Sequence, residues 1–407
     1  MTQTAIISGA LSPWDRAGNP RPMAEDLAII AIEALRKAGM RPADIDAIVC
    51  TTSAIPFDSP SYITLSAQLM AQRLAEKMGS HGAQCFNVSG ACASGAMAFT
   101  IGNYLIKSGS AKNVLVAGID NSPPGFFFQC PSVLDTDLAS CYPHKVIGAT
   151  NPTYWAMWAH RRAYEMGKSI EEIKHLMALV KHYHSLYGVL NPYARFRRVF
   201  TVEEVLASPI VCDPLHLYMI GAVSSGAGAI ILTDLESAKK YTNKPVVVAA
   251  SAVGGPVYGD SKLRLIFFAF TKKHPPFTEM KITVQRAYKE AGITQEDVEI
   301  MEVHDTSVFN TLLWIDVTMD WEREETDKLV KDGQIKHDGK LPVNLSGGTA
   351  SFGESVQNQI LVELYEIFLQ LRGEAGERQA KKNLKIGLAT AYGLLGSYGA
   401  VVLEKAW

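Results

Sequence analysis

Two motifs occur twice in this chain, in the same order, and this duplication restricts the possible folds more than any other feature of the sequence. Residues 34–50 (ALRKAGMRPADIDAIVC) resemble residues 287–303 (AYKEAGITQEDVEIMEV). Residues 87–94 (NVSGACAS) resemble residues 344–351 (NLSGGTAS). One such match could arise by chance, but two in the same order indicate an internal repeat.

The segments that follow the second motif have the periodicity of regular elements. Apolar residues at helical spacing predict a helix after each copy, over 96–107 and over 357–372. Each predicted helix leads into an apolar strand, at 113–118 and at 384–390. Strands that alternate with helices indicate an α/β fold, with mixed sheets and helices packed on their faces.

The repeat divides the chain into two halves and an insert. We expect similar α/β halves at residues 1–121 and 244–407, with residues 210–243 completing the first half through a strand at 226–233. The insert, residues 122–209, is irregular and rich in aromatic residues and histidines. Such an excursion between compact repeats is typical of a lid over a binding site. The alternative is an accessory subdomain that packs on the core or on a partner chain.

Composition excludes several classes of protein. Of the 407 residues, 47% are hydrophobic and 20% are charged, which is typical of a globular protein and not of a disordered chain. Lys and Arg number 39 against 41 Asp and Glu, so the charge gives no indication of nucleic acid or of an anionic membrane as partner. We find neither a signal peptide nor an apolar run of the ~20 residues that span a bilayer, and we expect a cytoplasmic protein.

The cysteines indicate a reduced compartment and one reactive residue. The six cysteines form no CxxC pair, which favours neither a disulfide framework nor a zinc ribbon. Cys92 lies among small residues just before a predicted helix, with Asn87 and Ser89 as expected caps. The positive end of that helix would favour the thiolate and hence nucleophilic attack on an acyl group. We interpret the others as structural cysteines; they are Cys50, Cys85, Cys130, Cys141 and Cys212.

These features resemble the thiolase superfamily, and most closely its sterol-carrier-protein-type branch. The resemblance rests on the duplicated halves, on the CASG segment at Cys92, on EVHDTSVF at 302–309 and on NLSGGTASFGES at 344–355. It implies a five-layered α-β-α-β-α thiolase fold, coenzyme A as co-substrate, a homodimer and no metal in this chain. Relatives in this branch often work with a small partner that carries a zinc ribbon and an OB-fold, so we expect a separately encoded partner of that kind.

The resemblance assigns catalytic roles residue by residue. Cys92 matches the nucleophile, and His304 matches the position that donates a hydrogen bond to the thioester oxygen. Where the family often has a catalytic cysteine this chain has Thr306, and where it has a Gly-His-Pro histidine this chain has Glu354. Tyr392 remains in the last family motif, which lacks its usual cysteine or histidine here.

The replaced acid and base leave two alternatives open. Glu354 could take the proton of Cys92 directly if burial raised the pKa of its carboxyl group, although a carboxylate beside a thiol also opposes thiolate formation. Alternatively Tyr392 or a water molecule transfers the proton.

Coenzyme A contacts are expected at five residues. Arginines suit phosphate groups, although a solvated basic turn is an equally good reading of the arginine cluster. The residues are Arg195, Arg197 and Arg198 in the insert, and Ser225 and Gly226 in the SSGAG segment. His182 and His184 lack a further ligand at fixed spacing and do not predict a metal site.

The resemblance implies an acyltransferase that cleaves a 3-oxoacyl-CoA with coenzyme A through an acyl-Cys92 intermediate. The altered acid and base and the aromatic insert favour a bulky or aromatic substrate, as in benzoylsuccinyl-CoA thiolases. The alternatives are an aldolase of the same fold, which cleaves a β-hydroxyacyl-CoA with Tyr392 and His304, and a non-catalytic subunit that binds acyl-CoA.

Overall fold

The strands of both halves join into one sheet in the computed structural model, which describes residues 2–18, 23–52, 69–122, 151–255, 257, 278–393 and 396–407. In this described part, ten strands form a sheet in the order β10-β11-β12-β9-β1-β8-β5-β3-β4, with β2 paired to β8. The strands of the first half are β1 (Thr4–Leu11), β2 (Asp15–Arg16), β3 (Ala47–Thr52), β4 (Gln84–Asn87), β5 (Asn113–Asn121) and β8 (Ser224–Asp234). Those of the second half are β9 (Val246–Gly254), β10 (Ile300–Glu302), β11 (Ile386–Gly393) and β12 (Ser397–Lys405).

The two halves repeat the same strand arrangement. In the first half β1 and β5 flank β8 and run antiparallel to it, and β3 continues parallel to β5. In the second half β9 and β11 flank β12 in the same way, and β10 continues parallel to β11. A short antiparallel pairing joins the halves, from Thr4 opposite Val248 to Ile6 opposite Val246. The internal repeat is therefore a repeat of structure.

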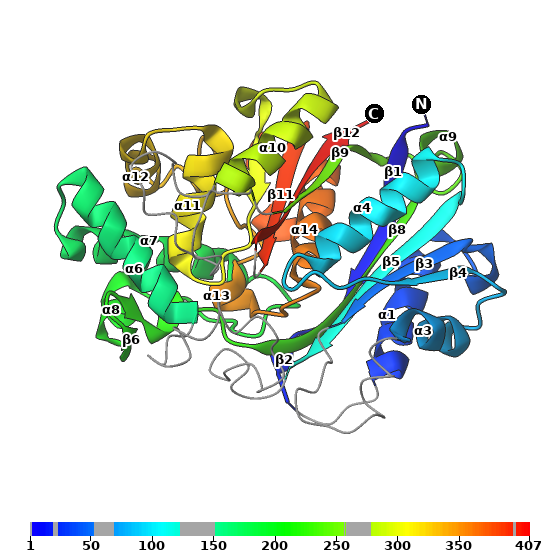
Figure 1. Cartoon of the computed structure of the whole chain (residues 1–407), viewed down its shortest axis with the longest axis horizontal. Helices are drawn as coiled ribbons and strands as arrows, with labels where there is room; N and C mark the ends of the chain where they lie inside the picture. Colours follow the sequence, from blue (N-terminus) through cyan, green and yellow to red (C-terminus); the bar gives the residue numbers. More distant parts are fainter. Residues whose placement is uncertain are drawn as a thin grey trace.

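Two long helices lie between the halves and form the central layer (Figure 1). α4 (Ser94–Lys107) contacts β3 and β5 of its own half and β9 and β12 of the other. α14 (Gln359–Arg372) contacts β10, β11 and β12 as well as β1 and β8. Both are mostly buried, in keeping with a helix that has protein on every side.

Further helices cover the outer faces of the sheet. α1 (Met23–Ala38) and α3 (Met70–Met78) pack on the first half, and α10 (Thr278–Ala291) packs on β9 and β12. In both repeats a glycine with positive φ follows the outer helix, Gly39 at 67° and Gly292 at 70°. Both copies of the first repeated motif, residues 34–50 and 287–303, thus end a helix with a glycine in the same conformation.

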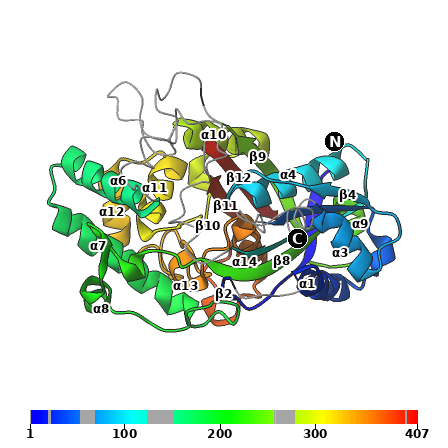
Figure 2. The same ribbon diagram turned by 60° about the horizontal axis from the view of Figure 1, so that its bottom comes forward.

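The described part of the insert is helical, which corrects the expectation of an irregular segment. α6 (Asn151–Met166), α7 (Ile170–Gly188) and α8 (Val202–Ala207) gather with α11 (Val308–Met319), α12 (Arg323–Lys331) and α13 (Thr349–Phe352) at one end of the molecule (Figure 2). Trp155 and Trp314 are buried in the shared core of these helices. This packing favours the accessory subdomain over a free lid; residues 123–150, with Cys130 and Cys141, lie outside the described part.

Short elements complete the described chain. They are η1 (Pro42–Asp44), β6 (Ile210–Cys212), β7 (Leu215–His216), η2 (Leu217–Met219), α9 (Leu235–Ala238), η3 (Gln295–Asp297) and η4 (Gly376–Arg378). Within the described residues, no helix combines the length and the apolar character that a membrane span requires.

Candidate active site

Cys92 lies on a tight turn between β4 and α4. Ala91, the residue before it, has a φ of 52°, a left-handed backbone conformation that residues other than glycine rarely adopt. The Ser94 hydroxyl stabilises the turn, because it accepts a hydrogen bond from the Gly90 N–H at 2.7 Å and donates one to the Ala91 carbonyl. The backbone thus presents Cys92 on a locally strained turn of the kind found at functional sites.

The other half of the molecule caps α4, contrary to the expectation from Asn87 and Ser89. The Asn87 side chain instead accepts a hydrogen bond from the Ala71 N–H at the start of α3, at 2.8 Å. At the start of α4, the Gly95 N–H donates to the carbonyl of Gln357, also at 2.8 Å. The turn that carries Cys92 is therefore held by a loop of the second half.

The surroundings of Cys92 raise its pKa, which corrects the prediction of a helix-stabilised thiolate. Burial by protein atoms has the largest effect, and the nearby carboxylates of Glu354 and Asp120 add to it. The field of α4 does not outweigh these effects, because Cys92 precedes the first helical residue, Ser94. A raised pKa favours the neutral thiol, which would need a base before it could attack.

The end of β11 lies against the cysteine turn. A Cβ atom on Gly393 would lie 2.9 Å from the backbone nitrogens of Cys92 and Ala93, so only glycine fits there. Tyr392, the residue before it, lies near enough to Cys92 for a thiolate to raise the pKa of the phenol, after the larger effect of burial.

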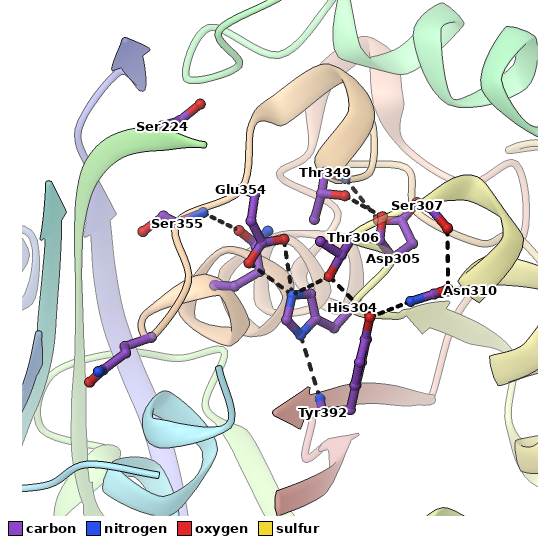
Figure 3. A network of polar contacts seen from close by, with 12 residues as sticks. Ser224, His304, Asp305, Thr306, Ser307, Asn310, Thr349, Glu354, Ser355 and Tyr392 are labelled. Atoms are coloured by element: carbon purple, nitrogen blue, oxygen red, sulfur yellow. Dashed lines mark hydrogen bonds and ion pairs between the residues drawn. The ribbon is translucent and has the colours of Figure 1, made fainter. Parts of the chain in front are cut away.

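His304 and Glu354 form a fully buried pair (Figure 3). The His304 Nε2 atom lies 3.1 Å from Oε1 and 3.0 Å from Oε2 of Glu354. On the other side of the ring, Nδ1 accepts the backbone N–H of Tyr392 at 3.5 Å, so the ring hydrogen is on Nε2 and points at the carboxylate.

This pair bears on two expected roles. Glu354 is hydrogen-bonded to the His304 imidazole, and direct proton transfer from Cys92 to Glu354, one of the two alternatives left open above, stays a prediction. The Nε2 hydrogen of His304, expected to meet a thioester oxygen, is engaged by Glu354. With both ring nitrogens of His304 engaged, the Glu354 carboxylate is the member of the pair that can accept a proton.

The Tyr392 hydroxyl is surrounded by protein groups. It accepts hydrogen bonds from the indole of Trp155 at 3.1 Å and from the amide of Asn310 at 2.5 Å. It donates to the Thr306 hydroxyl at 3.3 Å. With three partners, the phenol is better placed to orient its neighbours than to reach a substrate directly.

The segments that carry His304 and Glu354 are fixed by backbone contacts. The Asp305 side chain accepts the Thr349 N–H at 2.8 Å, and the Thr349 hydroxyl donates to the Asp305 carbonyl. The Glu354 N–H donates to the Ala222 carbonyl at 2.9 Å, and its own carbonyl accepts the Ser224 N–H at 2.8 Å. Little movement is left to the buried pair.

Comparisons with known proteins give the family. Residues 269–405 match the family described as "Thiolase C-terminal domain-like". The chain is 31% identical over 372 residues to the acetyl-CoA acetyltransferase of Methanothermobacter thermautotrophicus, covering 90% of each protein. The chain belongs to the thiolase family.

Other thiolases and related folds extend this likeness. The benzoylsuccinyl-CoA thiolase subunit BbsB of Thauera aromatica is 27% identical, with 75% of this chain and 76% of that protein covered. The structure titled "Ltp2-ChsH2(DUF35) aldolase" superposes with a TM-score of 0.80 at 20% identity, covering 99% of this chain and 98% of the other. The human mitochondrial 3-ketoacyl-CoA thiolase gives 0.69 at 17% identity, covering 100% and 99%. These two structures show a thiolase fold, as expected.

Two of the three arginines expected at coenzyme A have protein partners in this thiolase. Arg195 is half-buried and donates to the Val223 carbonyl at 2.8 Å and to the Ser224 hydroxyl at 2.9 Å. Arg198 pairs with Glu204 at 2.6 Å, while Arg197 is exposed. Arg195 therefore supports the backbone next to Glu354, and a phosphate contact for the cluster stays a prediction.

Ser225 and Gly226 are placed inside the sheet and not at a surface. Ser225 is 1% exposed and its hydroxyl donates to the Asp120 carbonyl at 2.9 Å. A Cβ on Gly226 would lie 2.3 Å from the indole nitrogen of Trp14. Packing accounts for both residues, and their burial gives no support to a coenzyme A contact.

Three site residues escaped the sequence analysis. Asp120 is the penultimate residue of β5, accepts the Gln357 N–H at 2.6 Å and acts on the pKa of Cys92. Trp155 and Asn310 hold Tyr392 from α6 and α11. The sequence offered a signal for Asp120 alone, as an acidic residue near the end of a mostly apolar strand. Among the residues described, no cluster of three or more His, Cys, Asp or Glu side chains suits a metal ion.

Proposed function

We propose that this thiolase-family protein is an acyltransferase that cleaves a 3-oxoacyl-CoA with coenzyme A. The observation that carries the proposal is the position of Cys92, on a strained turn beside the buried His304–Glu354 pair and the Gly393 backbone. The Methanothermobacter relative, an acetyl-CoA acetyltransferase, supports acyl transfer as the reaction class.

The proposed reaction begins with attack of the Cys92 sulfur on the 3-oxo carbon, while the thiol proton passes to the His304–Glu354 pair. The bond between C2 and C3 then breaks, its electrons leave with the CoA-bearing fragment, and the pair returns the proton to C2. The acyl group stays on sulfur until the thiol of a second coenzyme A attacks it and frees Cys92. Such proton transfer contributes about 10²–10⁴-fold to rate.

A bulky or aromatic acyl group is the proposed substrate, of the benzoylsuccinyl-CoA type. The BbsB relative supports this choice, as does Trp155, the aromatic residue of the insert that bonds Tyr392. We further propose a cytoplasmic homodimer assisted by a small zinc-ribbon and OB-fold subunit. The words "subunit" and "ChsH2(DUF35)" in the names of two similar proteins favour a second chain.

An aldolase is the second candidate function. The hydrogen-bond network around Tyr392, His304 and Thr306 offers acid and base groups that need no covalent intermediate. It would cleave a β-hydroxyacyl-CoA into a carbonyl compound and a shorter acyl-CoA, and Cys92 would be dispensable. A third candidate is a subunit that binds acyl-CoA without turnover.

Mass spectrometry separates the candidates. The wild-type protein is incubated with acetoacetyl-CoA or benzoylacetyl-CoA, and the peptide containing Cys92 is examined for an acyl adduct. We expect an adduct and thiolysis in the wild type, neither in Cys92→Ala, and both in the control Cys85→Ser. Full thiolysis by Cys92→Ala would refute the acyltransferase. Cleavage of a β-hydroxyacyl-CoA by that variant would establish the aldolase instead.

A further inference from the structure

Among the described residues, two polar groups lie within hydrogen-bond distance of the Thr306 hydroxyl, and both are donors. Its Oγ1 atom lies 3.3 Å from the Tyr392 hydroxyl and 3.3 Å from His304 Nε2 (Figure 3). The surrounding groups determine which partner donates the hydrogen in each of these two contacts.

The phenol of Tyr392 must donate to Thr306. The indole N–H of Trp155 can only donate, and it points at the phenol oxygen from 3.1 Å. The amide nitrogen of Asn310 donates to the same oxygen, while the amide oxygen accepts the Ser307 hydroxyl at 3.2 Å. Two donors occupy the lone pairs of the phenol, so its own hydrogen is directed to Thr306.

The imidazole of His304 cannot accept from Thr306 either. Its Nδ1 atom accepts the Tyr392 N–H, which leaves the ring hydrogen on Nε2. A neutral ring in this tautomer has no lone pair on Nε2. The Thr306 oxygen therefore faces two hydrogens. One belongs to the Tyr392 hydroxyl, and the other is the Nε2 hydrogen of His304, which also faces Glu354.

The hydrogen of the Thr306 hydroxyl consequently has no acceptor among the described residues. Thr306 is 4% exposed, and its carbonyl is fixed by the Gly221 N–H at 2.8 Å. A buried donor without a partner costs free energy, and in an active site it is typically matched by an acceptor on the ligand.

We propose that Thr306 is a catalytic residue whose hydroxyl donates a hydrogen bond to the carbonyl oxygen of the acyl group that Cys92 attacks. The proposal rests on the proposed acyl-CoA chemistry and adds a donor to it. As the sulfur adds to the carbonyl carbon, the π electrons move to oxygen, and the Thr306 hydrogen bond strengthens without transferring its proton. Since the Nε2 hydrogen of His304 is engaged by Glu354, Thr306 would supply the side-chain hydrogen bond that was expected from His304.

Substituting Thr306 tests the proposal in two assays. Thr306→Val removes the hydroxyl at nearly constant volume, and Thr306→Ser keeps it. We expect kcat for thiolysis to fall about 10²–10³-fold in Thr306→Val with little change in KM, the usual loss for one oxyanion donor, and to recover in Thr306→Ser. Thr318→Val is the matched control, because the Thr318 hydroxyl bonds the Trp314 carbonyl within α11.

The second assay does not depend on turnover. In a Cys92→Ala background, the infrared carbonyl band of bound, ¹³C-labelled acetoacetyl-CoA is compared with and without Thr306→Val. Loss of the donor should move the band to higher frequency, whereas Thr306→Ser should leave it in place. An unchanged band with unchanged kcat would overturn the role of Thr306 alone, because the proposed function is tested separately by mass spectrometry of the Cys92 adduct. Failure of the protein to bind any acyl-CoA would overturn both.

Discussion

His304 Nε2 lies 3.0 Å from Glu354 Oε2, and neither side chain has any exposure to solvent. The carboxylate faces the Nε2 hydrogen and fixes the orientation of the ring, while Nδ1 accepts the Tyr392 N–H, so within this pair the carboxylate is the group that can take a proton. Because the same carboxylate also raises the pKa of Cys92, one group has opposite effects on the nucleophile. It hinders ionisation in the resting state and supplies the base that removes the proton.

Glu354→Gln should therefore separate thiol ionisation from turnover. Without the negative charge the pKa of Cys92 falls, although burial still holds it high, so iodoacetamide should alkylate Cys92 faster at pH 8. Thiolysis should fall about 10²–10⁴-fold, because the amide cannot accept the proton. Alkylation rates and kcat measured on the same preparation check both effects. Parallel gains in alkylation and turnover would contradict the role of Glu354 as base.

Lys181 should make stability depend on pH. Its Nζ atom donates to the Ala350 carbonyl at 2.7 Å and to the Ser351 hydroxyl at 3.0 Å, and burial lowers its pKa to about 7. Between pH 7 and the usual pKa of about 10.4 the unfolded chain binds the extra proton, so this group makes stability rise with pH, by on the order of 4 kcal/mol. Below pH 7 the whole penalty is present.

Calorimetry of Lys181→Met checks this dependence. The variant loses two hydrogen bonds at every pH but no longer titrates. The difference in Tm between wild type and variant should thus change steadily from pH 6.5 to pH 9.5, in favour of the wild type. A constant difference across this range would show that the buried amine does not titrate there.

Glu363 should have the opposite pH dependence. It lies on α14, 2% exposed, and burial followed by the charges of Glu302 and Asp305 raises its pKa well above the ordinary value. The folded protein keeps this carboxyl protonated where the unfolded chain releases the proton, so the group lowers stability as pH rises above about 4.3. Glu363→Gln should raise Tm at pH 8 by about 1–3 °C and have no such effect at pH 4. An equal shift from the exposed Glu404→Gln would point to net charge instead.

Arg162 should be the most important ion-pair residue of the insert. From α6 it bonds Asp316 of α11, and its Nη2 atom lies 2.7 Å from Asp327 of α12. Arg162→Met removes the ion-pair partner of the Asp316 carboxylate and leaves the buried Asp327 with Lys168 alone, so it should destabilise the fold by about 3–5 kcal/mol. The neighbouring Arg161 pairs with Glu165 in a partly exposed position, and Arg161→Met should cost about 0–1 kcal/mol. Denaturant unfolding of both variants measures the contrast; similar losses would contradict it.

The repeated elements could be predicted because each has a local signal. The helices expected at 96–107 and 357–372 are α4 (Ser94–Lys107) and α14 (Gln359–Arg372), and the strands that follow were placed within a few residues. The thiolase family was equally accessible, since its motifs are contiguous in sequence. The domain boundaries drawn from the repeat stay a prediction.

The site could be predicted only as a set of residues and not as an arrangement. The cap of α4 is the backbone carbonyl of Gln357, and no side-chain pattern in the sequence predicts a backbone cap. The partner of Glu354 is decided by the approach of β10 and α13, and the pKa of Cys92 by burial and by Asp120 from another strand. The helices of the insert were not predicted for another reason: the capping box of Ser169 and Glu172 is a local helix signal, but the aromatic composition around it favoured an irregular segment.

The alignment of NVSGACAS with NLSGGTAS places Cys92 and Thr349 at the same position of the repeat. One copy offers sulfur to the substrate, whereas the other uses its hydroxyl and backbone to hold Asp305, the neighbour of His304. The same turn of the repeat would thus provide the nucleophile in one half and a structural support in the other. Because the two copies of the motif have different roles, the halves depend on each other. Neither half, expressed alone, would contain both the attacking atom and the group that activates it.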